Sequence, residues 1–130
     1  MSDMSVDAGV MLYVEEERAI ATTVAESVGL LAMEIGRHRF PDGELRLRLP
    51  PRLPASVVVW RGLHQPNEKL VELLLVAQTA RSLGAKYLTL VAPYLGYMRQ
   101  DMAFVPGEAI SQRIVGRFLA QLFDAVITVD

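Results

Sequence analysis

The chain has 130 residues, of which 52% are hydrophobic and 22% are charged, which is enough apolar side chain for one compact domain and excludes intrinsic disorder. It contains no cysteine, which excludes disulfides, thiolate metal sites and cysteine catalysis. Its net charge of -2 excludes a general electrostatic attraction to nucleic acid, so any phosphate site must be local.

Neither end of the chain nor its interior predicts a membrane or secretory segment. Residues 1–7 are acidic where a signal peptide would be basic. The densest apolar run, Leu73 to Ala77, is far shorter than the ~20 residues that cross a bilayer. We therefore expect a soluble, cytoplasmic protein with no nucleic-acid or membrane partner.

The first half of the chain predicts a strand, a helix and a hairpin. Val10–Val14 is a short apolar run typical of a buried strand, and residues 16–28 predict a helix ended by Gly29. Residues 31–40 and Leu45–Leu49 predict two strands joined by a turn, and the alternation of leucine and arginine in the second indicates that it is covered on one side only. The expected buried face of the helix consists of Ala19, Ile20, Val24 and Val28.

The second half predicts two consecutive strand-helix-strand units after a proline-rich loop at residues 50–54. The expected strands are Ser56–Trp60, Tyr87–Ala92 and 125–129, and the intervening helices are capped by Asn67 and Ser111. The first helix should run to about Leu83 and bury Leu70, Leu73, Leu74, Ala77 and Ala80; the second should bury Ile114, Val115, Phe118, Leu119 and Leu122. Such crossovers join parallel strands, so the predicted fold class is α/β, a mostly parallel sheet flanked by helices with a projecting β-hairpin.

A first polar cluster lies at the predicted turn, Phe40-Pro41-Asp42-Gly43-Glu44. Pro-Asp-Gly is first of all turn chemistry, because proline presets φ and glycine accepts a positive φ. The turn does not account for Phe40 and Glu44, on whose ring and carboxylate an adenine can stack and hydrogen-bond. The surrounding basic residues fit either a local phosphate site or a solvated hairpin face; they are Arg37, His38, Arg39, Arg46, Arg48 and Arg52.

A second polar cluster, Tyr97-Met98-Arg99-Gln100-Asp101, follows the predicted strand that ends at Ala92. Ligands of parallel sheets bind at this carboxyl edge. Arg99 offers forked donors to phosphate, Gln100 can bond ribose or phosphate, and Asp101 can orient the arginine or hold water on Mg²⁺. The alternative is a surface ion pair between Arg99 and Asp101.

The remaining motifs indicate less chemistry. Pro106-Gly107-Glu108 is most simply a loop before the helix cap at Ser111. His38 and His64 have no regular ligand spacing, so we predict no metal site. The sequence lacks Gly-x-Gly-x-x-Gly, Walker and Gly-x-Ser-x-Gly motifs, which argues against ordinary dinucleotide binding, a Walker ATPase and a serine hydrolase.

At these residues the chain resembles the ribose-phosphate pyrophosphokinases, also called phosphoribosyl pyrophosphate synthetases. The resemblance spans nearly the whole chain and rests on an ordered set: residues 40–44, 67–75, 93–101, 106–111 and 126–130. The members of this family are kinase-type transferases of nucleotide biosynthesis. They transfer the diphosphoryl group of MgATP to ribose 5-phosphate, giving phosphoribosyl pyrophosphate and AMP.

The family's subunits consist of two similar α/β domains of the phosphoribosyltransferase type and work as homo-oligomers. The resemblance implies that residues 1–130 are a single domain like the family's N-terminal one, and that the second domain, which binds ribose 5-phosphate, is absent. The family's metal-binding histidine also lies beyond the matched residues, so the Mg²⁺ ligands are expected outside this chain.

The resemblance places ATP on Arg99 and Gln100 within the subunit, with Asp101 nearby. Phe40, Asp42 and Glu44, with the Gly43 backbone, would reach across an interface to hold adenine in a neighbouring subunit's site. One departure is the pair Met102 and Ala103, where many members carry basic residues.

The resemblance also implies that this chain is inactive alone, because it supplies only part of one substrate's site. Two alternatives remain open: a non-catalytic regulatory or assembly module of the same family, and a generic α/β nucleotide binder outside it.

Overall fold

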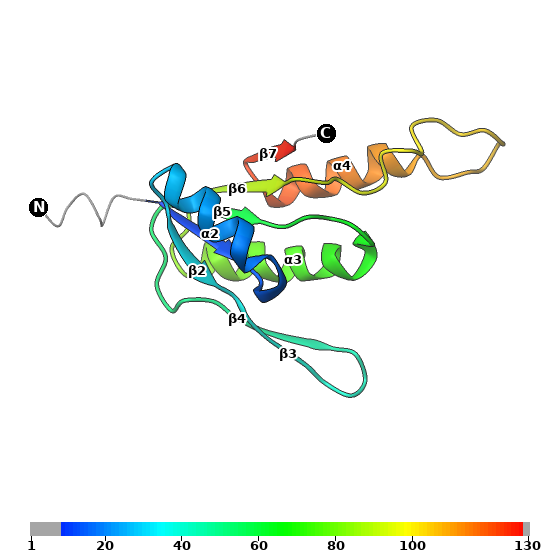
Figure 1. Cartoon of the computed structure of the whole chain (residues 1–130). Helices are drawn as coiled ribbons and strands as arrows, with labels where there is room; N and C mark the ends of the chain where they lie inside the picture. Colours follow the sequence, from blue (N-terminus) through cyan, green and yellow to red (C-terminus); the bar gives the residue numbers. More distant parts are fainter. Residues whose placement is uncertain (1–8, 129–130) are drawn as a thin grey trace, which may run out of the picture.

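A computed structural model describes residues 9–128 and shows a five-stranded parallel sheet with a separate two-stranded hairpin (Figure 1). The strand order in the sheet is β2-β1-β5-β6-β7. The register pairs Val10 with both Leu31 and Val57, which places β1 between β2 and β5. The sheet strands are β1 (Val10–Tyr13), β2 (Leu31–Glu34), β5 (Ser56–Trp60), β6 (Tyr87–Ala92) and β7 (Ala125–Thr128).

Helices cover both faces of the sheet, which confirms the predicted α/β class. The helices are α2 (Arg18–Ser27), α3 (Pro66–Ser82) and α4 (Ser111–Leu122), and a short 3-10 turn, η1 (Glu15–Glu17), precedes α2. On one face, α3 and α4 cover Leu12, Val59 and Leu90. On the other, α2 covers Met11 and Trp60. The two faces follow from strand alternation, since successive side chains point to opposite sides.

The hairpin consists of β3 (Gly36–Arg39) and β4 (Leu45–Arg48) and projects away from the sheet (Figure 1). The prediction of one strand over residues 31–40 was therefore wrong. The amide of Ile35 still donates to the Tyr13 carbonyl at 2.8 Å, and the Ile35 side chain is buried. Beyond it, β3 pairs only with β4 among the described residues, so the chain leaves the sheet at Gly36.

Helix α2 ends at a left-handed glycine as predicted, since Gly29 has φ +78°. Its buried face was predicted wrongly for Ala19, Ile20 and Val28, which are exposed, whereas Val24 packs against the core as expected. Ala21 and Ala25 are the buried residues, whereas Ile20 and Val28 are more than half exposed. The small alanines pack directly against the large side chains of Tyr13 and Trp60, and the bulkier Ile20 does not lie in this interface.

The cap predictions for the other two helices were also wrong. Gln65, with φ +49°, precedes Pro66 at the first position of α3, and neither α3 nor α4 has a side-chain cap. Ser111 is the first residue of α4 rather than its cap.

The buried faces of α3 and α4 also differ in part from those predicted. Leu74 and Ile114, which were expected to be buried, are exposed, while Val76 and, unexpectedly, the charged Glu72 are buried.

The other strands of the sheet match the sequence predictions. Strands β1, β5 and β6 lie where they were predicted, and β7 begins at Ala125 as expected. Val129 and Asp130, and the acidic residues 1–7, lie outside the described residues. No helix of residues 9–128 is long and apolar enough to cross a membrane.

Candidate functional site: the hairpin tip, the loop after β6 and the cleft between them

The direction in which the chain adds strands to the sheet reverses between β1 and β5. Open parallel sheets bind their ligands at such a point. The chain passes from β1 outward to β2 on one side, and from β5 to β6 and β7 on the other. At the carboxyl ends of these strands lies a cleft of about 490 Å³ beneath the hairpin. It is lined by Glu15, Glu16, Glu34, Ile35, Gly36, Arg37, Arg39, Leu45, Arg61, Glu68 and Lys69.

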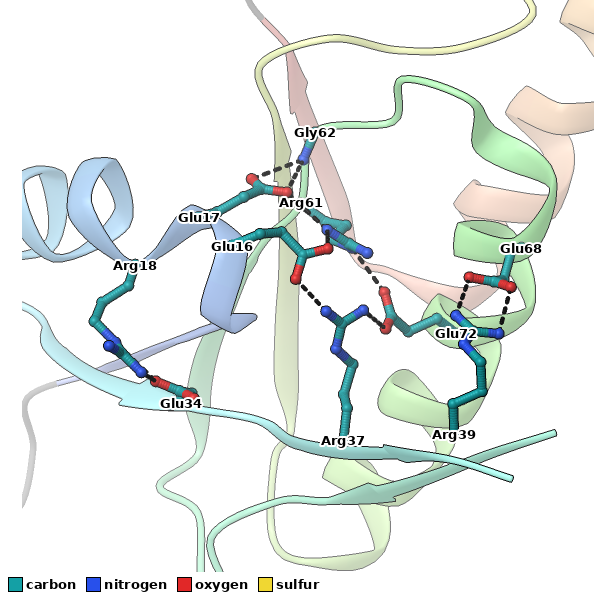
Figure 2. A network of polar contacts seen from close by, with 10 residues as sticks. All are labelled: Glu16, Glu17, Arg18, Glu34, Arg37, Arg39, Arg61, Gly62, Glu68 and Glu72. Carbon is teal, nitrogen blue, oxygen red and sulfur yellow. Dashed lines mark hydrogen bonds and ion pairs between the residues drawn. The ribbon is translucent and has the colours of Figure 1, made fainter. Parts of the chain in front are cut away.

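An ion-pair network fills the inner end of this cleft (Figure 2). The Arg61 side chain is only 4% exposed, and its guanidinium donates from Nε to Glu72 at 2.7 Å and from Nη1 to Glu17 at 2.8 Å. Arg37 donates to the other oxygen of Glu72 at 3.0 Å and also pairs with Glu16. Burial alone would lower the pKa of Arg61, but the Glu72 charge and the Glu17 hydrogen bond outweigh it and raise that pKa, so the guanidinium stays charged.

The charges of the cleft are internally balanced, which argues against a phosphate site there. Its lining contains four glutamates, one lysine and three arginines, and each arginine pairs with a carboxylate of this chain. A phosphate would have to displace those carboxylates and leave them unpaired in a partly buried place. The cleft therefore serves structure, by joining the hairpin to β5 and α3.

Sequence reasoning missed this network. The local signal was present, because Arg61 follows the last residue of an interior strand, where a charged side chain needs a partner. Nothing in the sequence identifies that partner, since Glu72 is 11 residues away in a helix that was expected to bury only apolar residues.

The hairpin tip is a tight, internally bonded turn, as the sequence predicts. The Phe40 amide donates to the Glu44 carbonyl and the Gly43 amide to the Phe40 carbonyl, both at 2.9 Å. Asp42 accepts the Glu44 amide at 3.0 Å, and Gly43 has φ +94°, which favours glycine. These bonds hold Phe40, Asp42, Gly43 and Glu44 together on one exposed tip.

The two faces of the hairpin differ in chemistry. Arg37 and Arg39 lie opposite Leu47 and Leu45, and this face is turned toward the domain (Figure 2). On the other face, the His38 ring meets the Phe40 ring edge-on at 4.8 Å, and the Arg46 guanidinium lies 5.8 Å from the Phe40 centroid. The Phe40 ring therefore belongs to the outer face, with 37% of the residue exposed.

Arg39 ties the tip end of the hairpin to α3. Its guanidinium donates to both oxygens of Glu68, at 2.7 and 2.6 Å. Both side chains are about half exposed, so water and salt weaken this pair. The basic residues around the turn thus separate into two paired arginines on the inner face and exposed cations, Arg46 and Arg48, on the outer face.

The Arg39–Glu68 pair gives a test by pH. The hydrogen bond from Arg39, followed by its charge, lowers the pKa of Glu68 below the ordinary 4.5. A lowered folded-state pKa stabilises the fold above pH 4.5, and that stabilisation is lost as the pH falls through the folded value. We expect a carboxyl-carbon NMR titration to give Glu68 a pKa below 4.5, and Arg39→Gln to return it toward 4.5. An unchanged titration in Arg39→Gln would show that the pair is not formed in solution.

The second cluster lies on a long loop, residues 93–110, which leaves β6 at the carboxyl edge of the sheet and extends past the start of α4 (Figure 1). The loop is anchored near its start, where the Tyr97 hydroxyl donates to Asn67 of α3 and Gly96 is buried against Pro66. It is anchored again where the Gln112 amide of α4 donates to the Gln100 carbonyl at 3.0 Å.

Arg99 and Asp101 are exposed on this loop, and within residues 9–128 neither forms an ion pair with the other or with any other side chain. The alternative of an Arg99–Asp101 salt bridge is therefore wrong for this structure. Gln100 turns its amide to the Met102 carbonyl at 2.9 Å. Glu108 accepts the amides of Phe104 and Val105, which fits the predicted loop role of residues 106–108.

The residues of each polar cluster lie close to one another, but the two clusters, the hairpin tip and residues 97–101, are not joined to each other. No hydrogen bond or ion pair within residues 9–128 connects the hairpin tip with residues 97–101. In Figure 1 the hairpin and the loop extend from different parts of the domain.

Comparisons with known proteins show which family has this arrangement. A sequence model described as the N-terminal domain of ribose phosphate pyrophosphokinase matches residues 10–122. The chain belongs to this family. Among curated relatives, the ribose-phosphate pyrophosphokinase of Methanopyrus kandleri is 37% identical over 122 residues, and that of Halobacterium salinarum is 32% identical over 120 residues.

A crystal structure of phosphoribosylpyrophosphate synthetase from Mycobacterium smegmatis has the same fold, with a TM-score of 0.79 and 25% sequence identity, and the match covers 94% of this chain. The matches cover 93% and 92% of this chain for the two curated relatives, but only 42% and 43% of those relatives. They cover 42% of the crystallised chain. The chain thus spans less than half the length of the pyrophosphokinases that it matches, and it corresponds to their N-terminal domain.

Proposed function

We propose that this chain is the ATP-binding N-terminal part of a ribose-phosphate diphosphokinase, with Arg99, Gln100 and Asp101 as the nucleotide contacts within the subunit. One observation carries the proposal: Arg99 is exposed, without a carboxylate partner in the described residues, on the loop that leaves the carboxyl end of β6. The arginines of the cleft are by contrast all paired. A forked donor that the fold leaves available on the loop following a strand's carboxyl end suits the phosphates of ATP.

The hairpin tip is proposed to serve a neighbouring subunit in a homo-oligomer. Phe40 lies on the hairpin face turned away from its own domain, and no bond joins the tip to the Arg99 loop of the same chain. An adenine from another subunit's site can stack on the Phe40 ring and donate its amino protons to Asp42 or Glu44, with the Gly43 backbone alongside.

In the proposed reaction the diphosphoryl group of MgATP is transferred to ribose 5-phosphate, giving phosphoribosyl pyrophosphate and AMP. Residues 9–128 contain no group of three or more histidine, cysteine, aspartate or glutamate side chains placed to hold a metal. We propose that Mg²⁺ binds together with ATP through ligands outside this chain, and that ribose 5-phosphate binds to a further domain. The chain alone is proposed to bind ATP without turning it over, because phosphoryl transfer needs both substrates aligned.

The test is an ATP titration by calorimetry of the wild-type chain and of the Phe40→Ala and Arg99→Ala variants. We expect Arg99→Ala to weaken binding roughly ten- to hundredfold, the range for a lost charge-assisted hydrogen bond, and Phe40→Ala to weaken it by about tenfold. Arg113→Ala is the matched control, because Arg113 is an exposed arginine of α4 without an ion pair in the described residues.

The same variants test whether the two clusters act across subunits. A mixture of Phe40→Ala and Arg99→Ala chains contains sites with one intact contribution from each, so its ATP binding should exceed that of either variant alone. Equal affinity of all variants for ATP would overturn both assignments and favour a non-catalytic module of the family; the alternative of a nucleotide binder outside the family is already contradicted by the family match. Formation of AMP from ATP and ribose 5-phosphate by this chain would contradict the proposed need for a second domain.

A further inference from the structure

The hairpin is attached to the domain by side chains on its inner face and by the buried residues Ile35 and Leu49 that flank it. Strands β3 and β4 pair only with each other among the described residues. An isolated two-stranded hairpin is marginally stable in water and does not by itself fix its angle to the rest of a domain. The hairpin's inner face supplies contacts that fix this angle: Leu47 packs against the core, and Arg37 and Arg39 point toward α3 (Figure 2).

Arg37 attaches to a carboxylate that is itself held in place. Glu72 is 2% exposed, and one of its oxygens accepts the Arg61 Nε–H at 2.7 Å while the other accepts from Arg37 at 3.0 Å. Arg61 is held in turn by Glu17, whose oxygens also accept the Gly62 amide at 3.1 and 3.2 Å. Every member of this chain of contacts has a second partner, so Glu72 offers Arg37 a fixed position.

The second attachment of the hairpin is weaker. Arg39 and Glu68 form a bidentate pair, but their side chains are 47% and 57% exposed. Exposed pairs typically contribute below about 1 kcal/mol and are screened by salt, whereas buried pairs are screened much less. The Arg37 and Glu72 side chains are only 23% and 2% exposed, so of the two contacts this partly buried pair is the one that persists in concentrated salt.

We propose that Arg37 and Glu72 are positioning residues that aim the hairpin tip, and that ATP affinity in the neighbouring subunit's site depends on this buried clamp. This inference rests on the proposed function of the tip. Neither residue touches nucleotide; they act through Phe40, which is carried on the opposite face of the same hairpin. A tip that swings loses affinity because binding must then restrict its motion.

A measurement of tip position tests the proposal directly. The chain has no native cysteine, so nitroxide labels can be placed at Pro41→Cys on the tip and at Glu26→Cys on α2 without competing sites. Pulsed electron spin resonance on samples diluted with unlabelled protein gives the distribution of the intramolecular distance. Arg37→Gln is the preferred variant, because it releases the hairpin while leaving the buried Arg61–Glu72 pair intact. Arg48→Gln is the control, since Arg48 lies on the outer face of the hairpin and forms no ion pair within residues 9–128.

In Arg37→Gln we expect the distance distribution to widen by about twofold and ATP affinity to fall roughly tenfold. Arg48→Gln should match the wild type in both measurements. The wild-type distribution should stay narrow in about 1 M salt, because the buried pair is little screened. The melting temperature of each variant is measured as well, to separate release of the hairpin from general destabilisation. General destabilisation lowers the melting temperature but does not widen the distance distribution at low temperature.

Several results of these measurements would contradict the proposed clamp or the proposed function of the tip. A narrow distribution in Arg37→Gln overturns the proposal, as does a wild-type distribution that widens in salt, which would assign the clamp to Arg39–Glu68. A wide distribution with unchanged ATP affinity also overturns it, provided that Phe40→Ala weakens ATP binding. If Phe40→Ala leaves affinity unchanged, the proposed function of the tip fails instead, and the distance measurement alone then decides whether the clamp exists.

Discussion

Replacing Glu72 with glutamine is expected to lower the free energy of unfolding by about 3–5 kcal/mol, which is the usual cost of breaking a buried ion pair by removing one partner. The change removes the charge that faces Arg61 and Arg37 but keeps nearly the same shape. Arg61, at 3% exposure, then retains Glu17 as its strong partner and cannot gain water in exchange. Urea denaturation followed by circular dichroism measures the loss.

Glu68→Gln is the matched control, since it makes the same chemical change one turn earlier in α3 and also breaks a pair with a hairpin arginine. Because both partners there are exposed, we expect a loss within about 1 kcal/mol. Similar losses in the two variants would show that burial does not set the strength of these pairs. A Glu72→Gln protein as stable as the wild type would mean that the network is not formed in solution.

Replacing Gly96 with alanine is expected to destabilise the fold by about 1–3 kcal/mol, the range for overpacking a tight site, and to shift the loop that carries Arg99. A Cβ at position 96 would lie 2.7 and 2.8 Å from two ring carbons of Pro66 and 3.0 Å from the Leu63 carbonyl oxygen. A proline ring and a backbone carbonyl have no rotamer by which to move aside. The β6 loop and the start of α3 must therefore separate.

Gly116→Ala is the opposite control, because a Cβ there meets nothing within 4 Å and the position lies inside α4. Alanine is the better helix former, so this variant should gain about 0.5–1 kcal/mol. Denaturation curves measure both changes, and chemical shifts of Arg99 and Gln100 should move only in Gly96→Ala. A neutral Gly96→Ala would show that the loop is not seated on α3 as described.

The parts of the fold that sequence could predict are those governed by local chemistry. The apolar runs of β1, β5 and β6, the glycine after α2 and the Pro-Asp-Gly turn each carry their own signal. The hairpin tip was predicted for the same reason, because turn residues specify their backbone without help from distant segments. Alternation along β4 likewise predicted its exposed arginines.

The parts that sequence could not predict depend on partners far along the chain. Residues 31–40 look like one strand, and only the pairing of Leu31 with Val10 and of Gly36 with Arg48 separates it into two. The buried face of α2 was misread because hydrophobicity favours Ile20 over Ala21, whereas close packing on Trp60 favours the smaller residue. Glu72 could not be recognised as buried without knowing that Arg61 and Arg37 meet it. The contacts of Arg99, Gln100 and Asp101 with ATP stay predictions.

Trp60 is the only tryptophan of the chain, and it directly precedes Arg61. Its ring is buried beside Tyr13 under α2, and its indole nitrogen has no hydrogen-bond partner in residues 9–128. The tryptophan fluorescence of this protein, excited selectively over its tyrosines, therefore originates from a single buried site at the end of β5. Its emission wavelength gives an optical record, needing no added dye, of whether water has reached the neighbourhood of the arginine.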